Sequence, residues 1–199
     1  MPISMRRFKR LAIALSLVVI SMLREQRAYA ADGRIQFIGT ISDQTCKING
    51  SDKNADLVVN LPKVNTSALA TPNDRAGLVS FVLKLTGCKA KSGTVYPHFL
   101  MGETVDPSTG RLLNSSSGIG GAKNVQIELL GSDLGVLQLA RESGDQNVLK
   151  AELQAVSVGE PAITTGEATM KFYSQYVASG GPATAGEVES YVLYEMVYP

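Results

Sequence analysis

The chain has 199 residues, of which 44% are hydrophobic and 19% are charged, with 19 Lys and Arg against 18 Asp and Glu. Without residues 1–30, which read as an export signal, 13 basic and 17 acidic residues remain, and this negative balance argues against nucleic acid or an anionic membrane surface as a partner. The remaining 169 residues suit one domain with enough material for a core.

The first 30 residues have the three parts of an export signal. Basic residues cluster between positions 6 and 10, residues 11–23 form a thirteen-residue apolar run, and Ala28-Tyr29-Ala30 has the small-x-small form of a cleavage site. A membrane anchor is the weaker alternative, because a span needs roughly twenty apolar residues. We therefore expect cleavage after Ala30.

The mature chain would open directly into a strand. Ile35, Phe37, Gly39 and Ile41 alternate with other residues, as the side chains of one strand face do. Most domains leave their first residues loose and polar, so an ordered strand at this position needs a reason. The position of Gly39 also needs a reason, because a glycine interrupts the apolar face of the strand.

The rest of the chain is a series of short alternating segments separated by turn residues, which predicts an all-β sandwich or barrel. Pro97 indicates an edge or a bulge in its strand. One segment, 147–156, also fits a helix, since Leu149, Leu153 and Val156 lie at helical spacing. The predicted strands lie within 55–64, 77–88, 94–101, 124–130, 135–140, 147–156, 168–178 and 190–199.

Two cysteines remain in the exported chain, Cys46 and Cys88. A structural disulfide is the natural interpretation in an oxidising compartment, whereas a redox site would need closely spaced cysteines such as C-x-x-C. Closing a loop of about forty residues contributes roughly 4 kcal/mol in the chain-entropy interpretation.

The sequence lacks the residue patterns of common enzyme sites. His98 is the only histidine, which excludes a multi-histidine metal site, and no G-x-S-x-G motif accompanies it. The glycine-rich segment 117–122 has neither the spacing nor the lysine of a phosphate loop, and Glu187 and Glu189 lie beside a strand with nothing to form a pocket. We predict no catalytic residue, no cofactor and no metal, and hence a structural or binding protein.

The C-terminal segment is apolar on both faces. Val192, Tyr194, Met196 and Tyr198 share one face, and apolar residues also occupy the other. Strands of this kind are buried on both faces, and an unprotected one would invite aggregation. Either the two ends of the chain cover each other, or each is covered by another chain.

These features together resemble the fimbrial (pilin) subunits that Gram-negative bacteria assemble by the chaperone–usher route, type 1-like major fimbrial subunits among them. The resemblance covers the whole mature chain. It rests on the alternating N-terminal strand, on "SDQTC" with the first cysteine, on the second cysteine that closes "FVLKLTGC", on Gly186 as the fourteenth residue from the end, and on the penultimate Tyr198. Pro199 is a small departure, because many relatives end in a polar residue.

The resemblance implies an incomplete immunoglobulin-like β-sandwich that lacks its last strand. Residues 31–43 would be an N-terminal donor-strand extension and residues 44–199 the pilin domain. The donor-strand residues would be Ile35, Phe37, Gly39 and Ile41, with Gly39 fitting a shallow part of a neighbour's groove. The strand beside the groove, which would also contact the chaperone, would carry Gly186, Val192, Tyr194, Met196 and Tyr198.

The resemblance also implies a function. The chain would be a structural subunit of a fimbria on the bacterial cell surface, exported through the periplasm and polymerised by donor-strand exchange. Its partners would be identical or related subunits, a periplasmic chaperone and an outer-membrane usher, and the fimbria would support adhesion to surfaces or to a host receptor. The alternative is a self-complete, secreted β-sandwich binding module whose N-terminal strand folds back on its own domain.

Overall fold

The computed structural model describes residues 36, 46–51, 55–116 and 120–198. The chain divides into two units, Met1–Ile41 and Ser42–Pro199, and the fold described below is that of the second. The predicted export signal lies outside the described residues, and so does the predicted N-terminal strand except for Gln36. Across the described ranges, no helix is long and apolar enough to cross a membrane.

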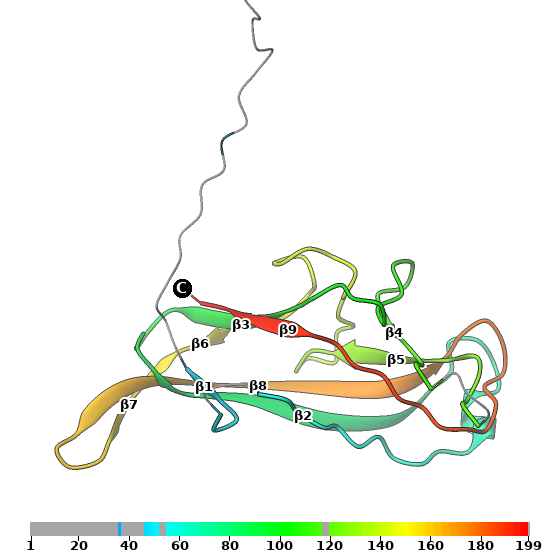
Figure 1. Ribbon diagram of the computed structural model, residues 1–199, viewed down its shortest axis with the longest axis horizontal. Coiled ribbons are helices and arrows are strands. Elements are labelled where there is room, and N and C mark those ends of the chain that lie inside the picture. The colour runs from blue at the N-terminus through cyan, green and yellow to red at the C-terminus, as the bar shows by residue number, and fades with distance from the viewer. Residues whose placement is uncertain (1–35, 37–45, 52–54, 117–119, 199) are drawn as a thin grey trace, which may run out of the picture. The chain divides into compact units, whose positions relative to one another are not determined.

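Two antiparallel sheets make up the second unit (Figure 1). The larger sheet has the order β1-β2-β8-β5-β4, and β7 also pairs with β8; the smaller has the order β6-β3-β9. The all-β prediction is confirmed. The strands are β1 (Lys47–Ile48), β2 (Arg75–Cys88), β3 (Thr94–Phe99), β4 (Leu112–Leu113), β5 (Val125–Leu130), β6 (Ala151–Glu152), β7 (Gln154–Val158), β8 (Ile163–Ala178) and β9 (Tyr194–Val197), and the 3-10 turn η1 spans Thr66–Leu69.

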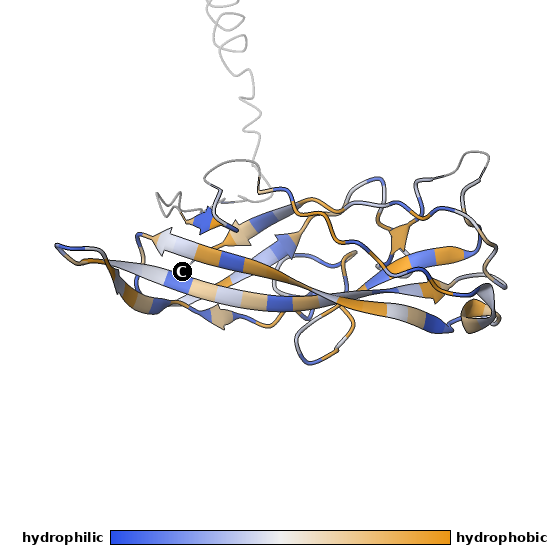
Figure 2. Ribbon diagram, turned by 90° about the horizontal axis from the view of Figure 1, so that it is seen from below, coloured by the Kyte–Doolittle hydropathy of each residue, from blue (hydrophilic) through white to orange (hydrophobic). Residues whose placement is uncertain are grey.

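The core lies between the two sheets and is built by period-two alternation along the strands (Figure 2). On β8 the ring of Phe172 stacks on Phe81 of β2, with ring centroids 5.5 Å apart. Phe99 of the smaller sheet meets Phe172 edge-on at 5.8 Å, so aromatic contacts connect the two sheets. Each fully buried apolar side chain of this kind contributes about 1.5–3 kcal/mol.

The disulfide prediction is confirmed. Cys46 and Cys88 are bonded, with their sulfur atoms 2.07 Å apart, just before β1 and at the end of β2. Gly166 of β8 packs against the same place, because a Cβ atom there would lie 2.0 Å from the carbonyl oxygen of Ala90 and 3.3 Å from Cβ of Cys88. The disulfide therefore holds the beginning of the described domain against the β2–β8 pair.

Two predicted strands are absent from the structure, and one segment that also fitted a helix is a strand. Residues 55–64, predicted as a strand, form no ladder, because they run beside the open groove described below and find no partner strand. Residues 135–140 make only an isolated bridge from Val136 to Leu130. Residues 147–156, which also fitted a helix, contribute to β6 and β7 instead, because Leu153 is buried in the core between them.

The outward face of β5 carries a buried carboxylate. Glu128 is 1% exposed and accepts hydrogen bonds from Arg75 Nε at 2.8 Å, Arg111 Nε at 3.2 Å and Gln175 Nε2 at 2.9 Å. Burial pushes the pKa of Glu128 up, but the hydrogen bonds and the two positive charges outweigh it and bring the pKa below its ordinary value. The carboxylate thus ties together β2, β5, β8 and the segment before β4.

Candidate functional site

An apolar groove of about 680 Å³ opens along one side of the domain, between the two sheets. One wall is the C-terminal segment from Ser190 to Tyr198, which includes β9, and the other is the segment from Ala55 to Leu61. The floor comes from the core strands. Its residues are Phe81 and Leu83 of β2, Phe99 of β3, Ile127 and Leu129 of β5, and Ser174 of β8, with Ile48 and Leu112 beside them.

The groove lies where both sheets have an incomplete edge. Within the described residues, β9 pairs with β3 on one side and with no strand on the other. On the larger sheet, β1 covers β2 only at Leu85 and Thr86, so most of that edge of β2 also has no described partner strand. Unpaired strand edges present backbone N–H and C=O groups that can pair with an added strand.

The C-terminal residues singled out in the sequence lie at the groove, with one exception. Val192, Tyr194, Met196 and Tyr198 all line it and pack against the core cluster. Glu195, between two of them, is exposed, and its Oε1 lies 3.0 Å from Nδ1 of His98. Alternation along β9 therefore sends the apolar residues to the groove and the charged one to solvent.

Gly186 lies away from the groove. It fits closely against another loop, since a Cβ atom there would lie 2.3 Å from the backbone nitrogen of Ala122. The next residue, Glu187, pairs with that loop through hydrogen bonds of 2.8 and 2.9 Å to Gly120 and Ala122. Gly186 also lines a smaller pocket of about 180 Å³ together with Leu69, Val188 and neighbouring residues. Its geometry requires a glycine, because no larger side chain fits there.

Two tyrosine hydroxyls lie in the groove and keep their protons. The hydroxyl of Tyr194 donates a 2.9 Å hydrogen bond to the carbonyl oxygen of Ala55, which connects the two walls. Burial raises the pKa of Tyr194, with smaller contributions from Asp56 and Tyr198, and burial also raises the pKa of Tyr198. Both phenols are therefore neutral at neutral pH.

Two serine hydroxyls at the groove are buried without a hydrogen-bond partner among the described residues, those of Ser174 and Ser190. Buried polar groups are normally satisfied, so these two hydroxyls stand out in a lining that is otherwise mostly apolar.

The predicted donor-strand residues Ile35, Phe37, Gly39 and Ile41 lie outside the described residues, so their roles stay predictions. The sequence missed the second wall of the groove, residues 55–61, because an alternating apolar segment looks the same whether or not another strand pairs with it. His98 lies at the surface end of β3 next to Glu195, and no cluster of metal-binding side chains occurs in the described part of the chain.

Comparison with known proteins shows the family of the chain. The model of the type-1 fimbrial protein family (FimA) matches residues 61–199. The chain is 41% identical to the major fimbrial subunit SMF-1 of Stenotrophomonas maltophilia (strain K279a), over 86% of this chain and 95% of that one. It is 34% identical to the F17 fimbrial protein of Escherichia coli, over 90% and 94%.

A solved structure is also similar, that of the P pilus rod subunit PapA, with a TM-score of 0.49 and 22% identity over 83% of this chain and 100% of that one. The sequence relatives settle the family, because one of them exceeds 40% identity over nearly the whole of both chains. The chain belongs to the type-1 fimbrial protein family and is a fimbrial subunit.

Proposed function

We propose that this fimbrial subunit polymerises by donor-strand exchange, with residues 31–43 of one copy filling the groove of the next. The observation that carries the proposal is the open apolar groove beside β9, whose free edge has no strand partner among the described residues. An extended segment that adds to such an edge gains main-chain hydrogen bonds and places alternate side chains in the groove.

The alternating N-terminal residues suit this groove. Burying Ile35, Phe37 and Ile41 at roughly 1.5–3 kcal/mol each gives about 5–9 kcal/mol before ordering costs. Main-chain hydrogen bonds to β9 add about 1 kcal/mol apiece. Gly39 then gives the register, because a residue without a side chain fits where the groove is shallow. This role also gives a reason for the strand that the sequence predicts at the start of the mature chain.

Before assembly, the same groove needs a temporary occupant. An exposed apolar groove of this size promotes aggregation, so we propose that a periplasmic chaperone covers it along Val192, Tyr194, Met196 and Tyr198 and delivers the subunit to an outer-membrane usher. The assembled fimbria supports adhesion to surfaces or to host cells. The subunit acts as a structural element and not as an enzyme.

The test is size analysis of the purified mature protein, with and without a synthetic peptide of residues 31–43 added during refolding. Donor-strand exchange gives heat-resistant polymers that become capped monomers when the peptide is present. Phe37→Asp is the matched variant, and it removes polymers while leaving the groove able to bind the wild-type peptide.

The opposite result would support a self-complete β-sandwich binding module. In that case the protein is a folded monomer that ignores the peptide, and deleting residues 31–42 destabilises it because its own strand is lost. Under donor-strand exchange the same deletion leaves the sandwich intact and removes only the ability to donate.

A further inference from the structure

The β7–β8 hairpin extends past the ends of β3 and β9 (Figure 1). Its five residue pairs run from Gln154 opposite Glu167 to Val158 opposite Ile163, and its turn occupies residues 159–162. Every residue from 157 to 163 is exposed. A two-stranded hairpin without a core on either face is at best marginally stable in water, so an extension of this length needs a contact elsewhere.

One face of this hairpin is apolar and β-branched. Residues directly opposite each other share a face, so Val158 and Ile163 lie together at the tip, followed by Val156 and Thr165. The tip pair is 56% and 66% exposed. The other face carries Ser157 and Thr164, whose hydroxyls are 3.1 Å apart. The two faces therefore differ in chemistry, and only the first offers apolar area to a partner.

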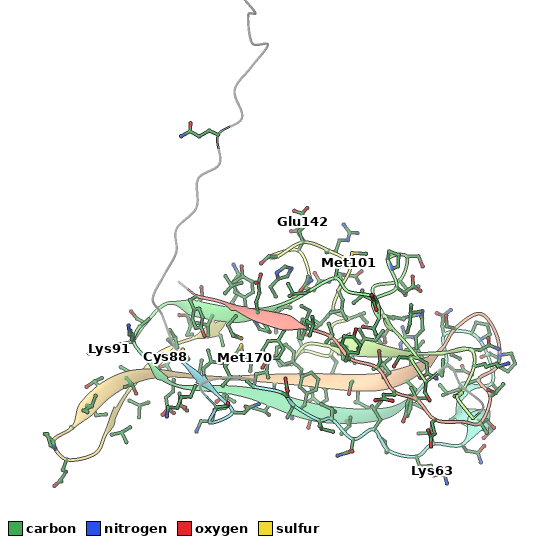
Figure 3. The ribbon with its side chains drawn as sticks, in the orientation of Figure 1. Lys63, Cys88, Lys91, Met101, Glu142 and Met170 are labelled. Carbon is green, nitrogen blue, oxygen red and sulfur yellow. A yellow bond between two sulfur atoms is a disulfide. The ribbon has the colours of Figure 1, made fainter. Side chains whose placement is uncertain are left out.

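The hairpin begins beside the point where the described domain starts. Cys88 is the register partner of Gly166, and Cys88 is bonded to Cys46 (Figure 3). Ile163 lies three residue steps along β8 from Gly166, so the tip lies about 10 Å beyond the disulfide along the strand. Any segment that continues N-terminally from Cys46 thus leaves the domain near the root of the hairpin.

The length of the connecting chain brings a second copy within reach of the tip. Five residue steps separate Ile41, the last predicted donor residue, from Cys46, and an extended chain of that length spans at most about 17 Å. The end of the neighbour's groove that holds the donor segment must therefore lie within that distance of the donating copy's disulfide. We propose that the tip of the β7–β8 hairpin, through Val158 and Ile163, contacts the neighbouring copy that accepts the donor segment.

This inference rests on the proposed donor-strand exchange and adds a second, non-covalent contact to the same junction. The accepting copy has apolar surface to offer, because Leu57, Tyr191 and Leu193 border its groove and are exposed. A contact between different surfaces of two identical chains is heterologous, and repeated head to tail it produces a filament. The hairpin would limit bending at each junction, because it adds a second contact beside the donor strand.

The test uses a photo-crosslinking residue at Ile163 in the full-length chain, assembled into fimbriae in cells. A second variant carries the photo-crosslinking residue at Val158 instead. With two positions, the loss of one apolar side chain from the contact does not by itself determine the crosslinking result. The control position is Glu142, an exposed residue that Figure 3 shows well away from the hairpin. A further control is protein capped with the peptide of residues 31–43, which has a filled groove but no neighbour.

Irradiated fimbriae are expected to give covalent dimers from position 163 or 158 in at least about five-fold excess over position 142, because a held contact raises the local concentration of its partner. Capped monomers give none. Donor-strand polymers are measured separately, as heat-resistant ladders before irradiation. Ladders without the excess of dimers would overturn the hairpin contact and leave donor-strand exchange standing. An unmodified chain that forms no ladder would overturn both.

Discussion

The buried carboxylate of Glu128 offers a sharp test of how the domain is held together. The substitution Glu128→Gln keeps the shape of the side chain but leaves the guanidinium groups of Arg75 and Arg111 without their counter-charge. Removing one partner of a buried ion pair costs about 3–5 kcal/mol. The Arg75 side chain is 43% exposed and can turn to water, whereas that of Arg111 is 15% exposed, so we expect a loss of about 2–4 kcal/mol.

Thermal unfolding of the purified protein with its disulfide intact measures this loss. For a domain of this size it corresponds to a fall in Tm of roughly 5–15 °C. Glu152→Gln is the matched control, because Glu152 is exposed and has no ion pair among the described residues, and such a change stays within about 0.5 kcal/mol. A fall in Tm for Glu128→Gln no larger than that of the control would refute the reasoning.

The pH dependence of the stability difference provides a second check on the role of the Glu128 charge. The pKa of Glu128 in the folded protein lies below its ordinary value of 4.5, so its ionised form stabilises the fold above that value. The contribution is lost as the pH falls through the lower, folded-state pKa. The difference in stability between wild type and Glu128→Gln should therefore be full at neutral pH and shrink in acid below about 4.5. A difference that stays constant down to acid would show that the charge is not its cause.

Three further predictions follow from the groove, the disulfide and a close backbone contact. Met196→Glu should weaken binding of a labelled donor peptide at least about 100-fold, since a carboxylate in an apolar groove is costly. The control Glu195→Gln should leave the peptide affinity within a few-fold of wild type. Equal affinities of the two variants would contradict the groove assignment. Reducing the disulfide should lower the free energy of unfolding by about 2–5 kcal/mol in a urea titration. An unchanged urea midpoint would contradict a stabilising role of the disulfide. Gly166→Ala should lower the yield of folded protein, measured by circular dichroism, because its Cβ would lie 2.0 Å from the Ala90 oxygen, whereas Gly102→Ala, with open space around it, should fold normally.

Several strands could be predicted from local pattern alone. Segments 77–88, 94–101, 124–130 and 168–178 each contain or overlap a strand of the structure, because alternating apolar residues on a half-buried strand leave a period-two signal. Pro97 also behaves as expected. Pro97 lies opposite Met196, so on one side its strand pairs with β9. On the other side β6 pairs only with Thr94 and Val95. The N–H that proline lacks would therefore lie at a locally open edge of β3.

Other segments were decided by their surroundings. Residues 147–156 carry both helical and strand periodicity, and the burial of Leu153 between two different sheets selects the strand. The same alternation in 55–64 produces no strand, since the segment lines the groove without forming a ladder with β2 or β9. Local pattern describes what a segment can bury, whereas a ladder needs a second segment to pair with.

Cysteine count and alternation are local properties of the sequence, and they were enough to predict a disulfide-bonded, all-β fold. The resemblance to fimbrial subunits predicted the family. Only the tertiary structure showed that the groove has a second wall at residues 55–61, that Glu128 is buried between two arginines, and that the β7–β8 hairpin stands exposed beside the disulfide. These features depend on which distant segments meet in space. The doubly apolar C-terminal segment indicated that something must cover it, but only the structure shows which strand edges are unpaired, because pairing depends on a neighbour and not on any one residue.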